Sequence, residues 1–232
     1  TIVQYVDTAM VGRLGASATA TVSLSSTYNW TINSVIYSLG IGFLSYIARA
    51  IGEKNQEKIT KAAHQAILAA LGAGIFLTIV TMSIAPYMPI WMGADPSIRR
   101  DGSIYFTLIN LPILLRSGMV IFGAAIRSTG DTKTPMRINV FMNILNTCLN
   151  YVFIYMLAFG AIGAGIATAI SYSVGSILTA IAFLRNPILK VDLKHIKFDK
   201  PVMSDCLRIG IPVMFTQFVS CSGYIVATSL VS

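Results

Sequence analysis

The sequence predicts an all-α polytopic membrane protein, and three observations support this prediction. First, 55% of the 232 residues are hydrophobic and only 11% are charged, whereas an ordinary soluble domain carries about 25% charged residues. Second, apolar stretches of about 20 residues recur along the chain, which is the length needed to cross a hydrocarbon core roughly 30 Å thick. Third, the basic residues gather in the short connections between these stretches, as in multi-pass proteins.

The apolar stretches predict one partial and six complete membrane-spanning helices. They lie near residues 1–12, 28–48, 62–84, 104–126, 135–157, 163–184 and 205–229. The chain begins with Thr1 in an already amphipathic segment, without the charged start of a signal peptide, and ends at Ser232 inside another apolar run. We therefore expect truncation at both ends and a longer natural protein.

Most of the 17 Lys and Arg residues fall in three alternate connections. These residues are Arg49, Lys54, Lys58 and Lys61, then Arg127, Lys133 and Arg137, then Arg185, Lys190, Lys194, Lys197, Lys200 and Arg208. Only Arg13, Arg99 and Arg100 lie in the other connections. The positive-inside rule places the three basic connections in the cytoplasm. The net charge of +8 is thus a topology signal, and no basic stripe with interleaved aromatics indicates a nucleic-acid partner.

The longest connection is rich in lysine and has Pro187 and Pro201 near its ends, where we expect them to stop helices. This pattern predicts a linker between two lobes of the protein. The expected domains are residues 1–184, a cytoplasmic linker at 185–204, and the first helix of a second lobe at 205–232.

Asp7 is the only carboxylate that this segmentation places inside a span. A charge near the centre of a bilayer costs at least about 2.5 kcal/mol, so such acids face a polar interior and are usually functional. The alternative is that Asp7 lies at the membrane interface near Arg13.

The fifth span carries four asparagines, Asn139, Asn143, Asn146 and Asn150, at steps of four, three and four residues. On a helix all four fall within about 60° of arc. Amides that faced lipid would lose their hydrogen bonds. The stripe therefore lines a wet cavity, or it bonds to neighbouring helices without any substrate.

Arg116 lies in the middle of the fourth span, and Asn110 and Pro112 precede it by one or two turns. The sequence leaves three roles open for this arginine: it pairs with an acid, it contacts a substrate, or it extends along its aliphatic stem to the interface.

Enzyme and metal chemistry have no support in the sequence. Cys148, Cys206 and Cys221 form no CxxC pair and read as reduced packing residues. His64 and His195 have no second ligand or nucleophile at a useful spacing, and we interpret them as solvated or interfacial. No nucleotide-binding or hydrolase signature is present. We expect no cofactor, and energy from an ion gradient.

Several short motifs resemble those of multidrug and toxic compound extrusion (MATE) transporters. In order they are Val6–Gly15 (VDTAMVGRLG), Gly40–Gly42 with Ala48–Asn55 (ARAIGEKN), Arg127–Met136 (RSTGDTKTPM), Gly163–Ala169 (GAGIATA) and Arg208–Pro212 (RIGIP). Their order and their positions at the matching helices extend the resemblance over essentially the whole chain.

The resemblance implies two six-helix lobes around a central cleft that opens alternately to either side. This chain would be the N-terminal six-helix lobe of a twelve-helix transporter plus the first helix of the second lobe. Its partner would be the missing C-terminal lobe of the same chain. The implied function is secondary active antiport in the cytoplasmic (plasma) membrane, with small organic cations and drugs exported in exchange for H⁺ or Na⁺.

The family's cation site maps onto Asp7, Asn146, Asn150 and Thr168, with Na⁺ bound at Asp7 if sodium is the coupling ion. Several family members carry a second aspartate at the position of Asn150. The neutral amide leaves one formal negative charge, enough for a proton or a monovalent cation. Lining of the cleft is assigned to Asn110, Arg116, Asn139 and Asn143.

Two other classes of function fit the sequence less well. A lipid-linked precursor flippase of the same superfamily would share the helix bundle but would line its cleft with several cationic residues, and only Arg116 lies in the middle of a span. A membrane-embedded enzyme would need a metal or nucleophile cluster, which the sequence lacks. A binding assay that compares organic cations with anionic lipid headgroups would distinguish the flippase from the drug exporter.

Overall fold

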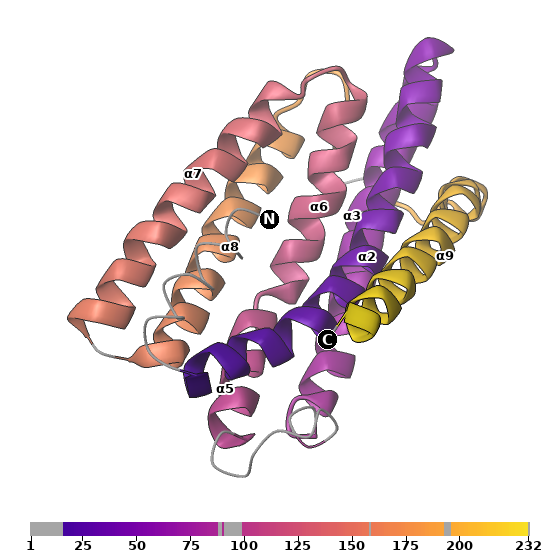
Figure 1. The fold of residues 1–232 in the computed structure, drawn as a ribbon. Helices are drawn as coiled ribbons and strands as arrows, with labels where there is room; N and C mark the ends of the chain where they lie inside the picture. The colour runs from indigo at the N-terminus through magenta and orange to yellow at the C-terminus, as the bar shows by residue number, and fades with distance from the viewer. Residues whose placement is uncertain (1–15, 88–89, 91–98, 158, 193–195, 232) are drawn as a thin grey trace. The chain divides into compact units, whose positions relative to one another are not determined.

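The computed structural model describes residues 16–87, 90, 99–157, 159–192 and 196–231, and this part of the chain is helical and contains no strand (Figure 1). It divides into two compact units. Unit 1 comprises residues 1–28, 74–116 and 136–178, and unit 2 comprises residues 29–73, 117–135 and 179–232. The expected division at 184 and 204 stays a prediction. The expected first span, 1–12, lies outside the described residues.

Most of the expected spans correspond to long helices. The helices are α2 (Ala16–Gly52), α3 (Gln56–Ile84), α5 (Arg99–Asn110), α6 (Ile113–Ser128), α7 (Lys133–Asn150), the π-helix η1 (Tyr151–Met156), α8 (Gly160–Leu184) and α9 (Lys200–Val231). Five segments of the described chain are long and apolar enough to cross a membrane, or six if α5 and α6 count as one bent span. The prediction of an all-α membrane protein is confirmed, although α2 begins 12 residues before the expected 28–48.

The expected fourth span, 104–126, was wrong as a single helix. It is broken between α5 and α6, whose axes differ by 42°. Pro112 is the physical reason, because its ring has no N–H and collides with the carbonyl four residues earlier in a continuous helix. The Asn110 side chain donates from Nδ2 to the Phe106 carbonyl at 2.9 Å, and so satisfies a carbonyl in the last turn of α5.

The fifth span changes its helix type just after its last asparagine. The chain is α-helical up to Asn150 and π-helical from Tyr151 to Met156. The π-type bond from the Leu157 N–H to the Val152 carbonyl measures 2.9 Å. A π-turn holds more residues than an α-turn, so the regular phase of the asparagine stripe ends at Asn150.

The core of unit 2 gathers apolar side chains from α2, α3, α6, α8 and α9. Phe122 of α6 stacks on Phe183 of α8, with ring centroids 4.5 Å apart. Two motif glycines set the crossing of α2 and α9. A Cβ on Gly42 would collide with the Cys206 backbone, and one on Gly210 would lie 2.9 Å from the Ser38 carbonyl oxygen. These glycines therefore serve close helix packing, as small residues do in membranes.

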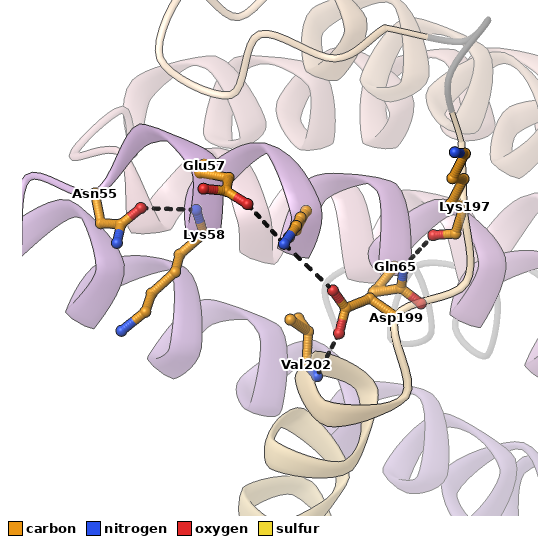
Figure 2. A network of polar contacts seen from close by, with 8 residues as sticks. Asn55, Glu57, Lys58, Gln65, Lys197, Asp199 and Val202 are labelled. Carbon is orange, nitrogen blue, oxygen red and sulfur yellow. Dashed lines mark hydrogen bonds and ion pairs between the residues drawn. The ribbon is translucent and has the colours of Figure 1, made fainter.

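The connection before α9 is shorter than expected, because α9 already begins at Lys200. The expectation that Pro201 stops a helix was wrong. Pro201 lies in the first turn of α9, where proline is tolerated because the N–H groups there have no intrahelical partner. Asp199 caps the helix: its Oδ1 accepts from the Val202 N–H at 3.2 Å (Figure 2).

This connection lies along the N-terminal turns of α3, which hold it by several polar contacts. Gln56 donates to the Ile188 carbonyl at 2.8 Å, and Gln65, which is fully buried, donates to the Lys197 carbonyl at 2.7 Å (Figure 2). His64 Nε2 accepts from the Asp192 N–H at 3.2 Å. His64 is 8% exposed, so its interpretation as a solvated histidine was wrong, and its interpretation as an interfacial one stays a prediction. His195 lies outside the described residues.

Candidate functional site

Unit 1 buries a set of polar side chains that come from four helices. They are Asn110 of α5, Arg116 of α6, Asn146 and Asn150 of α7, and Thr168 and Ser171 of α8. Polar groups in a membrane-embedded bundle are expensive unless they are hydrogen-bonded or line a polar interior. Their concentration makes the interior of unit 1 the candidate site.

Three of these side chains form a chain of hydrogen bonds. Asn150 donates from Nδ2 to Asn146 Oδ1 at 3.1 Å, and Asn146 donates from Nδ2 to Thr168 Oγ1 at 3.2 Å. The exposed fractions of the three residues are 0%, 1% and 6%. The structure thus brings together the three described members of the expected cation site. Asp7, the fourth, lies outside the described residues.

Two glycines allow α8 to come close enough for this contact. A Cβ on Gly163 would lie 2.8 Å from the Phe153 carbonyl oxygen of η1, and a Cβ on Gly165 would lie 3.2 Å from the Tyr105 ring. Contacts under 3.0 Å are essentially never seen for a real Cβ. The motif residues of the α8 entrance therefore set the close packing of α8 in unit 1.

The asparagine stripe of α7 divides into two halves. Asn139 is exposed and Asn143 is half-buried, and Asn143 donates to the Asn139 carbonyl at 2.8 Å within its own helix. Asn146, by contrast, bonds across to α8. Interhelical bonding therefore holds for Asn146, while cleft lining by Asn139 and Asn143 remains a prediction.

Arg116 is 4% exposed and lies over the ring of Tyr172, with Cζ 5.2 Å from the ring centroid. Extension to the membrane interface, one of its three expected roles, is wrong. Asn110 is fully buried and bonds within α5, and among the described residues its Oδ1 has no hydrogen-bond partner. Both residues belong to the interior of unit 1, and lining of a cleft by them remains a prediction.

Unit 2 has a pocket of about 550 Å³ beside the connection to α9, lined in part by Lys61, His64 and Phe198. Three of its charged side chains pair with one another: Lys61 Nζ lies 2.7 Å from the Glu57 carboxylate and 3.7 Å from the Asp199 carboxylate. We assign these contacts a structural role: they hold the connection that precedes α9 against helix α3.

Comparison with known proteins agrees with this arrangement of motifs and helices. The family model named MatE matches residues 1–152. The chain belongs to the MatE family. The probable multidrug resistance protein NorM of Thermotoga maritima is 29% identical over 230 residues, which cover 97% of this chain and 49% of that relative. The chain therefore spans about half the length of the curated relatives it matches, and it is a multi-pass membrane protein.

Solved structures agree with the MatE assignment. A crystal structure of MATE in the bent conformation matches with a TM-score of 0.89 and 26% identity, over 94% of this chain and 49% of that one. A second match is a MOP superfamily transporter from Pyrococcus furiosus, whose binding pocket is described as having reverse polarity. It has a TM-score of 0.86 and 26% identity over 93% of this chain and 48% of that one.

Sequence reasoning missed two members of the MatE chain's interior, Ser171 and Tyr172. Ser171 is buried and bonds within α8, and Tyr172 carries the Arg116 contact. The available signal was spacing: Thr168 and Tyr172 are four residues apart and so share one face of α8. An aromatic residue on the same face as a site threonine is a candidate partner for a nearby buried cation.

Proposed function

We propose that this chain forms one half of a secondary active antiporter that exports organic cations and drugs across the cytoplasmic membrane in exchange for H⁺ or Na⁺. Membership of the MatE family and similarity to a protein named for multidrug resistance support transport of foreign compounds. The second half would be a lobe of similar length, since the chain covers about half of its relatives.

The observation that carries the proposal is the buried hydrogen-bond chain of Asn150, Asn146 and Thr168. Carbonyl and hydroxyl oxygens can accept more than one contact. Buried carbonyl and hydroxyl oxygens near the middle of a bundle are suited to bind Na⁺ or to stabilise a proton-carrying acid. The position of these groups inside unit 1 supports a coupling-ion site that is shielded from the lipid.

In this proposal Asp7 supplies the negative charge. Two arguments support this role: its motif resembles the first-helix motif of MATE transporters, and it lies within a predicted span. An ion that enters from outside neutralises the carboxylate, and its release to the cytoplasm restores the charge. A cationic substrate responds to the same electrostatic field, so ion and substrate compete without contacting the same atom. With Asn150 as a neutral amide, one carboxylate performs this exchange.

Reconstitution of the full-length transporter in liposomes tests the function. An inward-directed H⁺ or Na⁺ gradient is expected to drive an organic cation dye in the opposite direction, and dissipation of that gradient is expected to stop the flux. Dye flux at the same rate with and without both gradients would contradict antiport.

A second candidate is a flippase for lipid-linked precursors. It is favoured by the buried positive charge of Arg116, which suits an anionic headgroup. Paired binding measurements with an organic cation and with a vesicle-borne anionic lipid headgroup distinguish the two. Preference for the headgroup would replace the drug-export proposal.

A further inference from the structure

An exposed aromatic side chain lies just before the last membrane-spanning segment. Phe198 is 66% exposed, and the stretch Lys200–Ser220 that follows it is long and apolar enough to cross a membrane. A side chain two residues before a span lies near the depth of the lipid headgroups, where aromatic residues are common in membrane proteins. At this depth the ring gains free energy when lipid replaces water around it.

Two lysines flank this ring, and their charges are available to a ligand. Lys197 and Lys200 are exposed, and within the described part of the chain neither forms an ion pair. In Figure 2 the Lys197 side chain extends away from the carboxylates of Glu57 and Asp199. An apolar ring between cationic side chains is the combination that binds an anionic membrane surface.

The two carboxylates beside the ring already have partners. Glu57 and Asp199 pair with Lys61, at 2.7 Å and 3.7 Å. Asp199 also caps α9, where its Oδ1 accepts from the Val202 N–H at 3.2 Å, and the positive end of the helix dipole offsets its charge. These acids therefore compete little for the two flanking lysines.

A pocket beside the ring offers room for a headgroup. Lys197 and Phe198 form part of the wall of the pocket of about 550 Å³ between the first turns of α3 and the connection, and ligand pockets in proteins measure about 300–1,000 Å³. Gln65 holds the backbone here through its bond to the Lys197 carbonyl at 2.7 Å. The lysine and the ring thus project from a backbone that is fixed against α3.

The surrounding end of unit 2 has an excess of positive charge. The described residues of this unit include eleven Lys and Arg and six Asp and Glu, and they lie near the helix ends that the basic connections join. Hydrogen bonds hold these ends together: Gln56 donates to the Ile188 carbonyl at 2.8 Å, and Asn186 donates to Thr129 Oγ1 at 3.4 Å. This charge attracts anionic lipid to the same end of the unit.

We propose that Lys197, Phe198 and Lys200 form a binding site for an anionic phospholipid of the cytoplasmic leaflet. The two ammonium groups contact the phosphate of the headgroup, and the ring contacts the glycerol and the upper part of an acyl chain. A zwitterionic phospholipid also carries a phosphate, but the same lysines repel its own cationic group. This inference depends on the predicted cytoplasmic side of the connection and goes beyond the proposed export function.

Photocrosslinking from position 198 identifies what covers the ring. In the full-length transporter, p-benzoylphenylalanine replaces Phe198, and the protein is placed in nanodiscs with equal amounts of phosphatidylglycerol and phosphatidylcholine of matched acyl chains. Mass spectrometry is expected to find crosslinked lipid, with phosphatidylglycerol favoured at least about tenfold, because each lysine contributes about fivefold.

Lysine variants in the same background test the charges. Lys197→Gln is expected to lower the preference for phosphatidylglycerol about fivefold, and the double change with Lys200→Gln is expected to bring the ratio of the two lipids close to one. Lys54→Gln is the matched control, because Lys54 is an exposed lysine of unit 2 that does not line the pocket. It is expected to change the ratio less than about twofold. Unchanged thermal unfolding temperatures report that the variants are folded.

Each outcome decides for or against the lipid site. Crosslinks mainly to the C-terminal lobe, or none at all, would show that lipid does not cover the ring and would overturn the inference. Equal crosslinking of the two lipids, or the same preference in every variant, would overturn the role of the lysines. Dye export is measured separately: export without a preference for phosphatidylglycerol leaves the proposed function intact, whereas the preference without export counts against that function alone.

Discussion

Asn146 donates a hydrogen bond from Nδ2 to Thr168 Oγ1 at 3.2 Å, and both residues are buried. This bond joins α7 to α8, which lie side by side in Figure 1. Because Asn146 also accepts from Asn150, a change at Thr168 affects the whole hydrogen-bond chain. The contact thus combines a structural role with the proposed role in ion binding.

Thr168→Ala is expected to destabilise the protein by about 1–3 kcal/mol, because it leaves the buried Asn146 amide without this acceptor. Thr147→Ala, on the exposed side of α7, is expected to stay within about 0.5 kcal/mol of the wild type. Thermal unfolding in nanodiscs measures both. In liposomes, Thr168→Ala is expected to impair Na⁺-driven export severely and H⁺-driven export only mildly. Equal stability of the two variants would argue against the buried bond.

Asp7→Asn is expected to abolish gradient-driven export while the protein still folds, because asparagine keeps the size and one acceptor but cannot carry the charge. Flux of an organic cation against an imposed gradient, together with the thermal unfolding temperature, measures the two effects. Export at the wild-type rate by Asp7→Asn would remove the coupling role from this carboxylate.

Gly163→Ala is expected to destabilise the protein by about 1–3 kcal/mol, because the new Cβ would lie 2.8 Å from the Phe153 carbonyl oxygen. Gly72→Ala is the matched control: nothing lies within 4 Å of its added Cβ, and alanine favours a helix by up to about 1 kcal/mol over glycine. Unfolding of both variants under the same conditions tests the contact. A Gly163→Ala protein as stable as Gly72→Ala would show that α8 does not pack this closely.

His64→Phe is expected to speed hydrogen exchange of the Asp192 amide about tenfold, because this N–H loses its acceptor at 3.2 Å. Lys61→Met removes two more exposed ion pairs, with Glu57 at 2.7 Å and with Asp199 at 3.7 Å, and exposed pairs contribute little. It is therefore expected to change exchange at Asp192 less than about threefold. Amide exchange followed by mass spectrometry measures both variants. A larger effect of Lys61→Met than of His64→Phe on exchange at Asp192 would contradict the view that buried hydrogen bonds hold this connection against α3.

A cysteine introduced at Lys133 is expected to resist labelling by an impermeant maleimide added to intact cells, since the positive-inside rule places this connection in the cytoplasm. Arg100 lies in a connection that we expect on the outer side of the membrane, so Arg100→Cys is expected to react. Both variants require a background without native cysteines, because Cys148 is exposed. Reaction of Lys133→Cys from outside would reverse the topology.

The sequence predicted most of the helices. The length of an apolar stretch indicates a membrane span, and the spacing of polar residues indicates which of them share a helix face. The four-residue and three-residue steps of the asparagines placed Asn146 and Asn150 on one face, and both are buried. The break at Pro112 and the early start of α9 at Lys200 were not predicted. Both depend on where a proline falls within a turn: it disrupts a helix interior and is accepted in a first turn.

The sequence by itself determined that this chain crosses a membrane, that it resembles MATE transporters, and which polar residues are candidates for the site. Only the tertiary structure decided which of these side chains meet. Arg116 and Tyr172 belong to different helices, as do Asn146 and Thr168. Helical periodicity fixes neighbours within one helix, whereas partners between helices depend on how closely two backbones approach, and here Gly163 and Gly165 set that distance for α8.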